Sequence, residues 1–580
     1  MDKLLAEAEG QCSPERATVV RLSGVREALL PLSGKASLLA PPAATPAVHP
    51  KYGEPAFTNA LASWLPKHPP LRRLTVLISS PKICGMSSCR LFLLGLCFVL
   101  QSALTAAVPP NFVWIVADDM SPDTGAYGAH GVETPNLDWL ASQGRRYNRA
   151  YATAPVCSAS RSAFILGCYQ TTTGLHAHDV ENPQPLQAPY IPLPTLLRNA
   201  GWFVTNAVAP GTVRSGKLIK KGKTHYNFAH DPAVLFNGDD WRKRKPGQPF
   251  FAQFQIAEPH RPFPIPEAYD EAKLRDIKLP ENYPDHPLMR RDWYAYQRSV
   301  EMVDKRVGVI LDQLREGGVL DNTIVIFFAD HGRPMPWGKQ WLSVEGLQVP
   351  LIMRGPGLAA GGVEDRLVSL IDLAPSLLEL AGLPIPNWME GKPIVGADFP
   401  ERSEIFAARD RCGDAQDRIR AVIGMDHLLV KNFDPSLSRL NWSGYKEASY
   451  PGMPLLRLLG AAGQLNAFQA QWIAPTRPEL EFYDLKKDPA GLHNVAAANP
   501  ADPLMTGMQG AMDQWIKTTG DRGALPDPPT EPTLEEIQKS KRGDYQRTWE
   551  KRLKKGEPTD AERVAWWEES YGLPPKVIVP

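Results

Sequence analysis

Uninterrupted apolar runs alternate with helix-spaced apolar residues along the middle of the chain. The runs Phe112–Ala117, Phe250–Ile256 and Thr323–Ala329 are typical of strands that are buried on both faces of a sheet. Between them, Leu193–Ala200 and Tyr296–Leu314 carry apolar residues at helical spacing and are followed by glycine. Helices between buried strands predict an α/β sandwich around a mostly parallel central sheet.

The start of the chain does not share this pattern. Residues 1–85 have no steady apolar period and are rich in Pro and Ala, so we expect a disordered or non-native extension before a start at Met86. Residues 86–107 combine one arginine, a short apolar core and small residues, which is typical of a secretory signal peptide; the alternative is a buried strand or helix. The run is too short for stable membrane insertion. We expect a secreted or periplasmic protein, or a lysosomal one in a eukaryote.

Three further segments follow from the composition of the remaining chain. We expect a catalytic α/β domain over 108–400, a smaller C-terminal α+β subdomain of short strands and loops over 401–519, and a charged, Pro-broken surface arm over 520–580.

Composition narrows the class of protein. Of the 580 residues 43% are hydrophobic and 22% are charged, which is typical of a globular protein, and the net charge of +1 gives no reason to expect a nucleic acid partner. Cleavage of the signal leaves Cys157, Cys168 and Cys412, so at most one disulfide can form. We interpret Cys168 and Cys412 as core residues or as a disulfide pair.

Two of the predicted strands end in ionisable pairs, Asp118-Asp119 and Asp330-His331. In open α/β sheets, ligands gather beyond the carboxyl ends of the strands. Three carboxylates at one sheet edge repel one another unless a cation lies between them, and oxygen ligands suit Ca²⁺ or Mg²⁺ better than zinc. A single pair would favour a solvated strand end or a helix cap, but two pairs on two buried strands favour a metal site.

The segment Pro155–Ser162 holds the next candidate, Cys157, with Arg161 four residues on. Such a cysteine can be a small buried apolar residue or an ordinary thiolate nucleophile. A third interpretation comes from the spacing Cys157-x-Ala159-x-Arg161, which resembles the modification signature of type I sulfatases, in which the cysteine is oxidised to formylglycine. Further segments resemble that family in the same order: Pro110–Asp119, Thr134–Asp138, Pro194–Phe203, Gly222–His225, Glu258–Pro262, Ala329–Gly332, Gly338-Lys339, Val349–Gly357 and Phe482–Pro489.

The resemblance implies an alkaline-phosphatase-like three-layer sandwich and sets the expected cofactors and partners. Cys157 is converted to formylglycine by a maturation enzyme, and the substrate is a sulfated saccharide, as in heparan-sulfamidase-like and iduronate-sulfatase-like members. The implied ligands of Ca²⁺, or alternatively Mg²⁺, are Asp118, Asp119, Cys157, Asp330 and His331.

The resemblance also implies roles for the catalytic residues. One hydroxyl of the hydrated aldehyde attacks sulfur, while Lys223, Lys339 and Arg161 offset the negative charge. His260 or Lys339 protonates the leaving alcohol, and His225 helps the second hydroxyl to expel sulfate.

Three departures from the family pattern are visible. Ala159 stands where proline is common, the usual threonine is missing from Ile165–Gly167, and Ala207–Lys221 resembles an insertion. Because no histidine follows Lys217 at the right spacing, Lys223 is the predicted sulfate-facing lysine. His176 and His178 can line the pocket or simply follow the signature helix, and we leave them outside the predicted catalytic set.

Other functions remain open at this point. The same superfamily includes phosphoester and phosphonate monoester hydrolases that use formylglycine. A metal-dependent phosphatase with an unmodified Cys157 is a further alternative. A glycan-binding protein without activity is disfavoured, because every polar position of the constellation is kept.

Overall fold

A seven-stranded sheet forms the centre of the molecule. The computed structural model describes residues 109–396, 399 and 401–574, which belong to one compact unit. The predicted extension and signal peptide lie outside the described residues. The strand order is β10-β2-β9-β8-β1-β7-β4. The bounds are β1 (Asn111–Ala117), β2 (Arg145–Tyr147), β4 (Phe203–Val208), β7 (Phe250–Ile256), β8 (Thr323–Ala329), β9 (Leu351–Arg354) and β10 (Gly362–Glu364).

The sheet is mostly parallel, as the buried apolar runs predicted. β1 pairs in parallel with β7 and β8, and β4 pairs in parallel with β7, whereas β9 runs antiparallel to both of its neighbours. All side chains of β1 are buried. Trp114 of β1 packs edge-on against Phe251 and Phe328 of the neighbouring strands, at 5.3 and 5.4 Å between ring centroids. This aromatic packing fixes the three central strands against one another.

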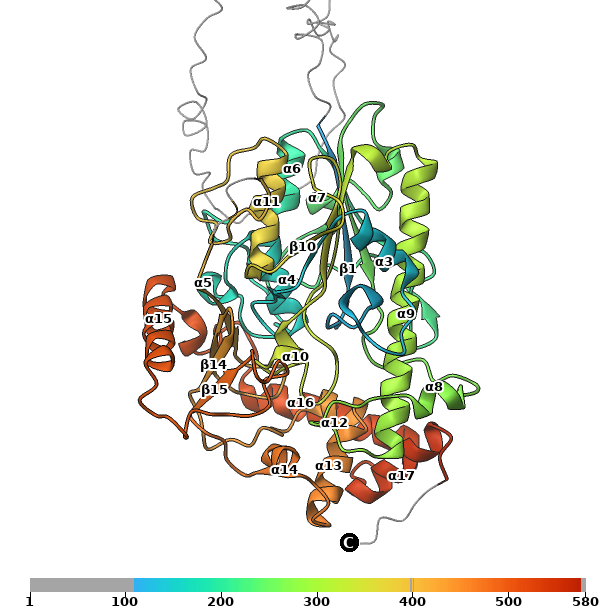
Figure 1. The fold of residues 1–580 in the computed structure, drawn as a ribbon, viewed down its shortest axis with the longest axis vertical. Helices are drawn as coiled ribbons and strands as arrows, with labels where there is room; N and C mark the ends of the chain where they lie inside the picture. The colour runs from blue at the N-terminus through green and yellow to red at the C-terminus, as the bar shows by residue number, and fades with distance from the viewer. Residues whose placement is uncertain (1–108, 397–398, 400, 575–580) are drawn as a thin grey trace, which may run out of the picture. The chain divides into compact units, whose positions relative to one another are not determined.

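Helices cover both faces of the sheet and complete the predicted three-layer sandwich (Figure 1). α3 and α9 pack together on one face, and on the other face α4 contacts both α6 and α11. α9 is amphipathic and extends beyond the predicted stretch at both ends. The bounds are α3 (Pro135–Ser142), α4 (Cys157–Leu166), α6 (Leu193–Asn199), α9 (Pro287–Glu316) and α11 (Leu373–Leu380).

A small antiparallel sheet lies beside the main one, in agreement with the predicted mixed α and β character of the C-terminal part. Its order is β12-β13-β14-β15, and α15 packs on it through Met505, Met508 and Met512. The bounds are β12 (Glu404–Arg409), β13 (Ile419–Gly424), β14 (His427–Asn432), β15 (Leu480–Asp484) and α15 (Pro503–Thr519).

The last helices pack against the body of the molecule. α16 (Leu534–Leu553) contacts α12 (Gly444–Ser449), and α17 (Asp560–Ser570) contacts α13 (Gly452–Ala461). Trp549 of α16 is fully buried in the main core. The segment predicted to be a surface arm is therefore anchored by aromatic burial in its described residues.

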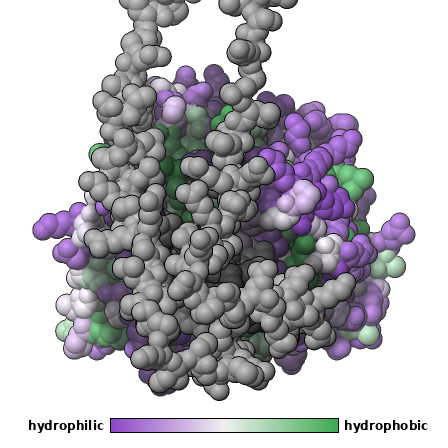
Figure 2. Space-filling model, turned by 90° about the horizontal axis from the view of Figure 1, so that it is seen from above, coloured by the Kyte–Doolittle hydropathy of each residue, from purple (hydrophilic) through white to green (hydrophobic). Residues whose placement is uncertain are grey.

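Short elements connect these layers. They are β3 (Ala150–Tyr151), α5 (Gln170–Thr173), β5 (Val213–Arg214), β6 (Lys217–Leu218), α7 (Pro232–Leu235), α8 (Glu271–Arg275), α10 (Val344–Leu347), β11 (Val368–Ser369) and α14 (Ala467–Ile473). In Figure 2, the described residues that are visible on this face are mainly hydrophilic, with apolar residues in separate small areas. Among the described residues, we find no helix with a stretch long and apolar enough to cross a membrane.

Candidate active site

The two predicted ionisable pairs meet at one edge of the sheet. β1 and β8 are parallel neighbours with Ala117 opposite Ala329, so their carboxyl ends coincide. The Asp119 backbone N–H donates to Oδ1 of Asp330 at 3.0 Å. Asp119 has φ +61°, a sparsely populated conformation for a residue other than glycine, which the surrounding contacts hold in place. Parallel pairing thus brings together carboxylates that are more than 200 positions apart in the sequence.

Cys157 begins helix α4 and points into this cluster. Its side chain is buried, and Sγ lies 3.6 Å from Oδ1 of Asp119, 3.3 Å from Nε2 of His331 and 3.3 Å from Nζ of Lys339. Burial alone raises the pKa of the Cys157 thiol, but the charges of Lys223 and Lys339 outweigh it and hold that pKa well below its ordinary value. The position therefore favours a negatively charged oxygen or sulfur.

Arg161 follows Cys157 by one helical turn and joins the two strand ends. Its Nε donates to Asp330 at 2.8 Å and its Nη2 to Asp118 at 3.0 Å, while Nη1 donates to Gln255 of β7 at 2.8 Å. The guanidinium is fully buried, and each of its three nitrogens donates one of these hydrogen bonds. Arg161 thus holds carboxylates from β1 and β8 in one arrangement.

Two lysines complete the positive side of the cluster. Nζ of Lys223 lies 2.7 and 2.8 Å from the two oxygens of Asp118, and Nζ of Lys339 lies 3.0 and 2.8 Å from those of Asp119. Burial lowers the pKa of Lys339, but the Asp119 carboxylate outweighs burial and holds that pKa well above its ordinary value. Both lysines predicted from the sequence are therefore in the site, whereas Lys217 is exposed on β6.

Four buried side chains could hold a divalent cation. The donor atoms of Asp119, Cys157, Asp330 and His331 lie within 4.8 Å of one another. Burial outweighs the charge of Arg161 and raises the pKa of Asp330 to about 6, so the protein itself leaves this carboxylate only partly compensated. Burial lowers the pKa of His331, but the Asp330 and Asp119 carboxylates raise it to about 10. The carboxylates of Asp119 and Asp330 stabilise positive charge beside them, and carboxylate oxygens are ligands that suit a hard divalent cation.

Asp118, the fifth predicted ligand, falls into a different group. Its donor atoms cluster with Asp119 and His260. Burial raises its pKa, but the charges of Lys223 and Arg161 outweigh burial and keep it well below the ordinary value. Asp118 is thus compensated by the protein, unlike Asp330.

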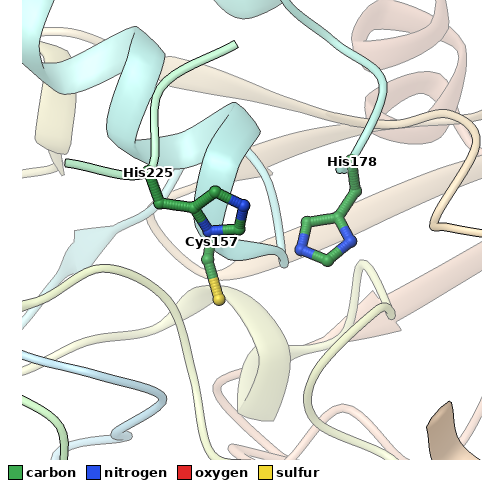
Figure 3. Close-up of side chains that lie close together, drawn as sticks. All are labelled: Cys157, His178 and His225. Atoms are coloured by element: carbon green, nitrogen blue, oxygen red, sulfur yellow. The ribbon is translucent and has the colours of Figure 1, made fainter. Parts of the chain in front are cut away.

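Cys157 also belongs to a second cluster, which it forms with two histidines. The side chains of Cys157, His178 and His225 converge in Figure 3. Nε2 of His225 lies 2.8 Å from Oδ1 of Asp179, and Nε2 of His178 lies 3.5 Å from the same oxygen. Burial lowers the pKa of His225, but the hydrogen bond with Asp179 raises it above its ordinary value. The catalytic set predicted from the sequence does not include His178 or Asp179. The closely spaced histidines of Leu175–Asp179 are the sequence signal that points to them.

His260 follows β7 and lies close to Asp118 and Asp119. Its Nε2 lies 3.8 Å from Oδ2 of Asp119, and Nη2 of Arg214 lies 2.9 Å from the ring nitrogens. Burial lowers the pKa of His260 to about 4 and outweighs the neighbouring carboxylates. His260 is thus a neutral imidazole at neutral pH, beside positively charged neighbours.

A cavity of about 420 Å³ opens over these residues. Cys157, Lys223, His225, His260 and Lys339 line its base. The far wall comes from the C-terminal region, with Ser443 and Tyr445 at α12 and Lys541, Tyr545 and Thr548 on α16. This volume is in the range of small-molecule sites and exceeds what a single sulfate group fills. The wall residues carry no local sequence signal, because only tertiary packing brings them here.

Comparisons with known proteins identify the family of the chain. The sequence model of the sulfatase family matches residues 110–383. An ulvan-active sulfatase of Formosa agariphila is 30% identical over 475 residues, which cover 72% of this chain and 76% of that protein. Human N-sulphoglucosamine sulphohydrolase is 29% identical over 358 residues, 53% of this chain and 65% of that protein. A solved 2-O GAG sulfatase shares the fold with a TM-score of 0.51 at 20% identity, over 73% of this chain and 96% of that one.

The layered fold and the charged strand ends define an α/β protein of the alkaline-phosphatase-like class. Within that class, the chain belongs to the sulfatase family. It is an enzyme, a sulfatase.

Proposed function

We propose that the protein hydrolyses sulfate esters, or an N-sulfate, of a carbohydrate. The observation that carries this proposal is the position of Cys157 Sγ, which lies within 3.6 Å of Asp119, His331 and Lys339 at the base of the cavity. The names of relatives support the substrate class, since one acts on ulvan and another on N-sulphoglucosamine.

Cys157 is the residue that we propose to be converted to formylglycine, with a formylglycine-generating enzyme as the maturation partner. The hydrated aldehyde supplies an oxygen nucleophile, and a bound Ca²⁺ or Mg²⁺ supplies positive charge beside it. Asp119, Asp330, His331 and the side chain at 157 would hold the cation, with Asp118 nearby.

The other side chains of the cluster have separate roles in the proposed reaction. Lys223 and Lys339 offset the negative charge of a sulfate group at the base of the cavity. Lys339 carries a proton at neutral pH and His260 does not, so of the two predicted acids Lys339 is the one ready to protonate the leaving oxygen. His225, which pairs with Asp179 and lies near residue 157, would take a proton there.

The place of action follows from the predicted signal peptide. We propose export to the periplasm or the extracellular medium, or delivery to the lysosome in a eukaryotic host, where sulfated glycans are accessible. The maturation partner would then meet the chain on its route out of the cytoplasm.

The test combines mass spectrometry with rate measurements. Protein matured in a host with a formylglycine-generating enzyme should contain the aldehyde at position 157, and its kcat/KM should be higher for an aryl sulfate than for the matching aryl phosphate or phosphonate. A preference for phosphate or phosphonate would instead favour the alternative hydrolase. An intact thiol in fully active enzyme would exclude the formylglycine mechanism.

A further inference from the structure

A short hairpin brings an unexpected arginine to the active-site cavity. β5 and β6 pair with Arg214 opposite Lys217, inside the segment that resembles an insertion. The two turn residues, Ser215 and Gly216, have φ +50° and +73°, as a two-residue type I′ turn requires. The backbone N–H of Val213 donates to Oε1 of Glu258 at 3.2 Å. This contact fixes the base of the hairpin to the chain just before His260.

Arg214 is a cation without a carboxylate partner. Its Nη2 lies 2.9 Å from the ring nitrogens of His260, and it lines the cavity. Among the described residues, no Asp or Glu lies within ion-pair distance of Arg214, whereas Arg161, Lys223 and Lys339 each have at least one such partner. A guanidinium stays charged at every physiological pH. Its charge at the cavity wall is therefore available to a ligand.

The position of Arg214 indicates which part of a substrate it would contact. Arg214 contacts His260, whereas the sulfate-facing Lys223 and Lys339 pair with Asp118 and Asp119. A group that contacts Arg214 thus belongs to the body of the substrate beyond the scissile sulfate. Tyr445, whose ring centroid is 6.0 Å from that of His260, gives this part of the cavity an aromatic wall.

We propose that Arg214 is a specificity residue that binds a second anionic group of the substrate, either a carboxylate or another sulfate of the saccharide. Guanidinium and carboxylate or sulfate oxygens match in geometry and form paired, charge-assisted hydrogen bonds. The inserted hairpin thereby selects multiply charged saccharides over neutral ones with a single sulfate. This inference rests on the proposed sulfatase action on a carbohydrate.

The experiment compares four substrates with matured enzyme: an aryl sulfate, a saccharide with one sulfate as its only charge, the same saccharide with one added carboxylate, and the same saccharide with one added sulfate. Wild type should prefer the doubly anionic saccharides. In Arg214→Ala, that preference, measured as a ratio of kcat/KM values, should fall by about 10- to 100-fold, mainly through KM. Arg214→Lys should keep part of the preference. Lys220→Ala, an exposed cation of the same segment, should keep all of it.

The outcomes separate this inference from the proposed function. Wild-type enzyme that carries formylglycine but cleaves no sulfate would sink the proposed function itself. Wild-type enzyme that cleaves sulfates, with an unchanged preference in Arg214→Ala, would overturn only the role of Arg214. Whether the added carboxylate or the added sulfate loses more in Arg214→Ala identifies the group that Arg214 binds.

Discussion

At the scale of single residues, the site is a balance of buried charges. Asp118 has Lys223 and Arg161 as partners, and Asp119 has Lys339. Asp330 shares Arg161 with Asp118, and burial leaves its pKa raised. Buried charges are tolerated only when they are paired and hydrogen-bonded, so the partly compensated charge of Asp330 fits the proposed cation.

This balance predicts different effects for two matched substitutions. Asp330→Asn removes a carboxylate from the four-residue donor cluster, whereas Asp118→Asn removes one that lysine and arginine already neutralise. We expect Asp330→Asn to weaken Ca²⁺ binding at least about tenfold more than Asp118→Asn does. Calorimetric titration of each apo variant with Ca²⁺ measures this. Equal losses in the two variants would contradict the assignment of Asp330 as the undercompensated ligand.

At the scale of elements, ion pairs join the small sheet to the helices around it. Arg420 of β13 donates to both oxygens of Asp521, which follows α15, at 2.7 and 2.8 Å. Arg420 is fully buried. Burial raises the pKa of Asp521, but the hydrogen bonds from Arg420 outweigh it and lower that pKa below the ordinary 3.8. The end of α15 is thus tied to the sheet by a charge-dependent contact.

The sign of this pKa shift predicts how stability depends on pH. The folded state holds the Asp521 proton less tightly than the unfolded state does, so the contribution is complete above pH 3.8 and is lost as the pH falls through the lower folded-state pKa. Below pH 4, wild type should therefore lose more unfolding free energy than Asp521→Asn does. Urea denaturation at pH 7 and at steps below pH 4 checks this. Parallel pH curves for the two proteins would show that Asp521 does not carry the effect.

At the scale of the whole molecule, the core of the fold and most of the site follow from local sequence patterns. The strands of continuous apolar residues, β1, β7 and β8, lie where the runs predicted them. Their parallel pairing explains why Asp118, Asp119, Asp330 and His331 meet. The pattern could not place His178 or Asp179 at Cys157, or α16 at the cavity, because these depend on the packing of distant segments rather than on periodicity. The domain boundaries stay a prediction.

Because α16 is partly buried, substitution of its buried side chains should destabilise the fold, which would not be expected for a detached surface arm. Trp549 is fully buried, and its ring lies 5.6 Å from that of Trp566. Trp549→Ala should lower the free energy of unfolding by about 3–5 kcal/mol, because it leaves a large cavity in the core. Arg547→Ala, an exposed change on the same helix, should cost less than about 0.5 kcal/mol. Chemical denaturation of both variants measures the difference, and a loss at position 549 as small as that at 547 would show a detached arm.

The approach of α16 to α12 has a consequence for how substrate preference evolves in this protein. The two helices touch so closely that a Cβ on Gly444 would meet the backbone oxygen of Lys541 at 2.8 Å. One side of the binding chamber is therefore built from the last part of the chain, and the reactive machinery from the first. Mutations near the C-terminus can change which substrate is accepted while the reactive residues stay the same. Two enzymes with identical reactive residues can therefore differ in substrate specificity.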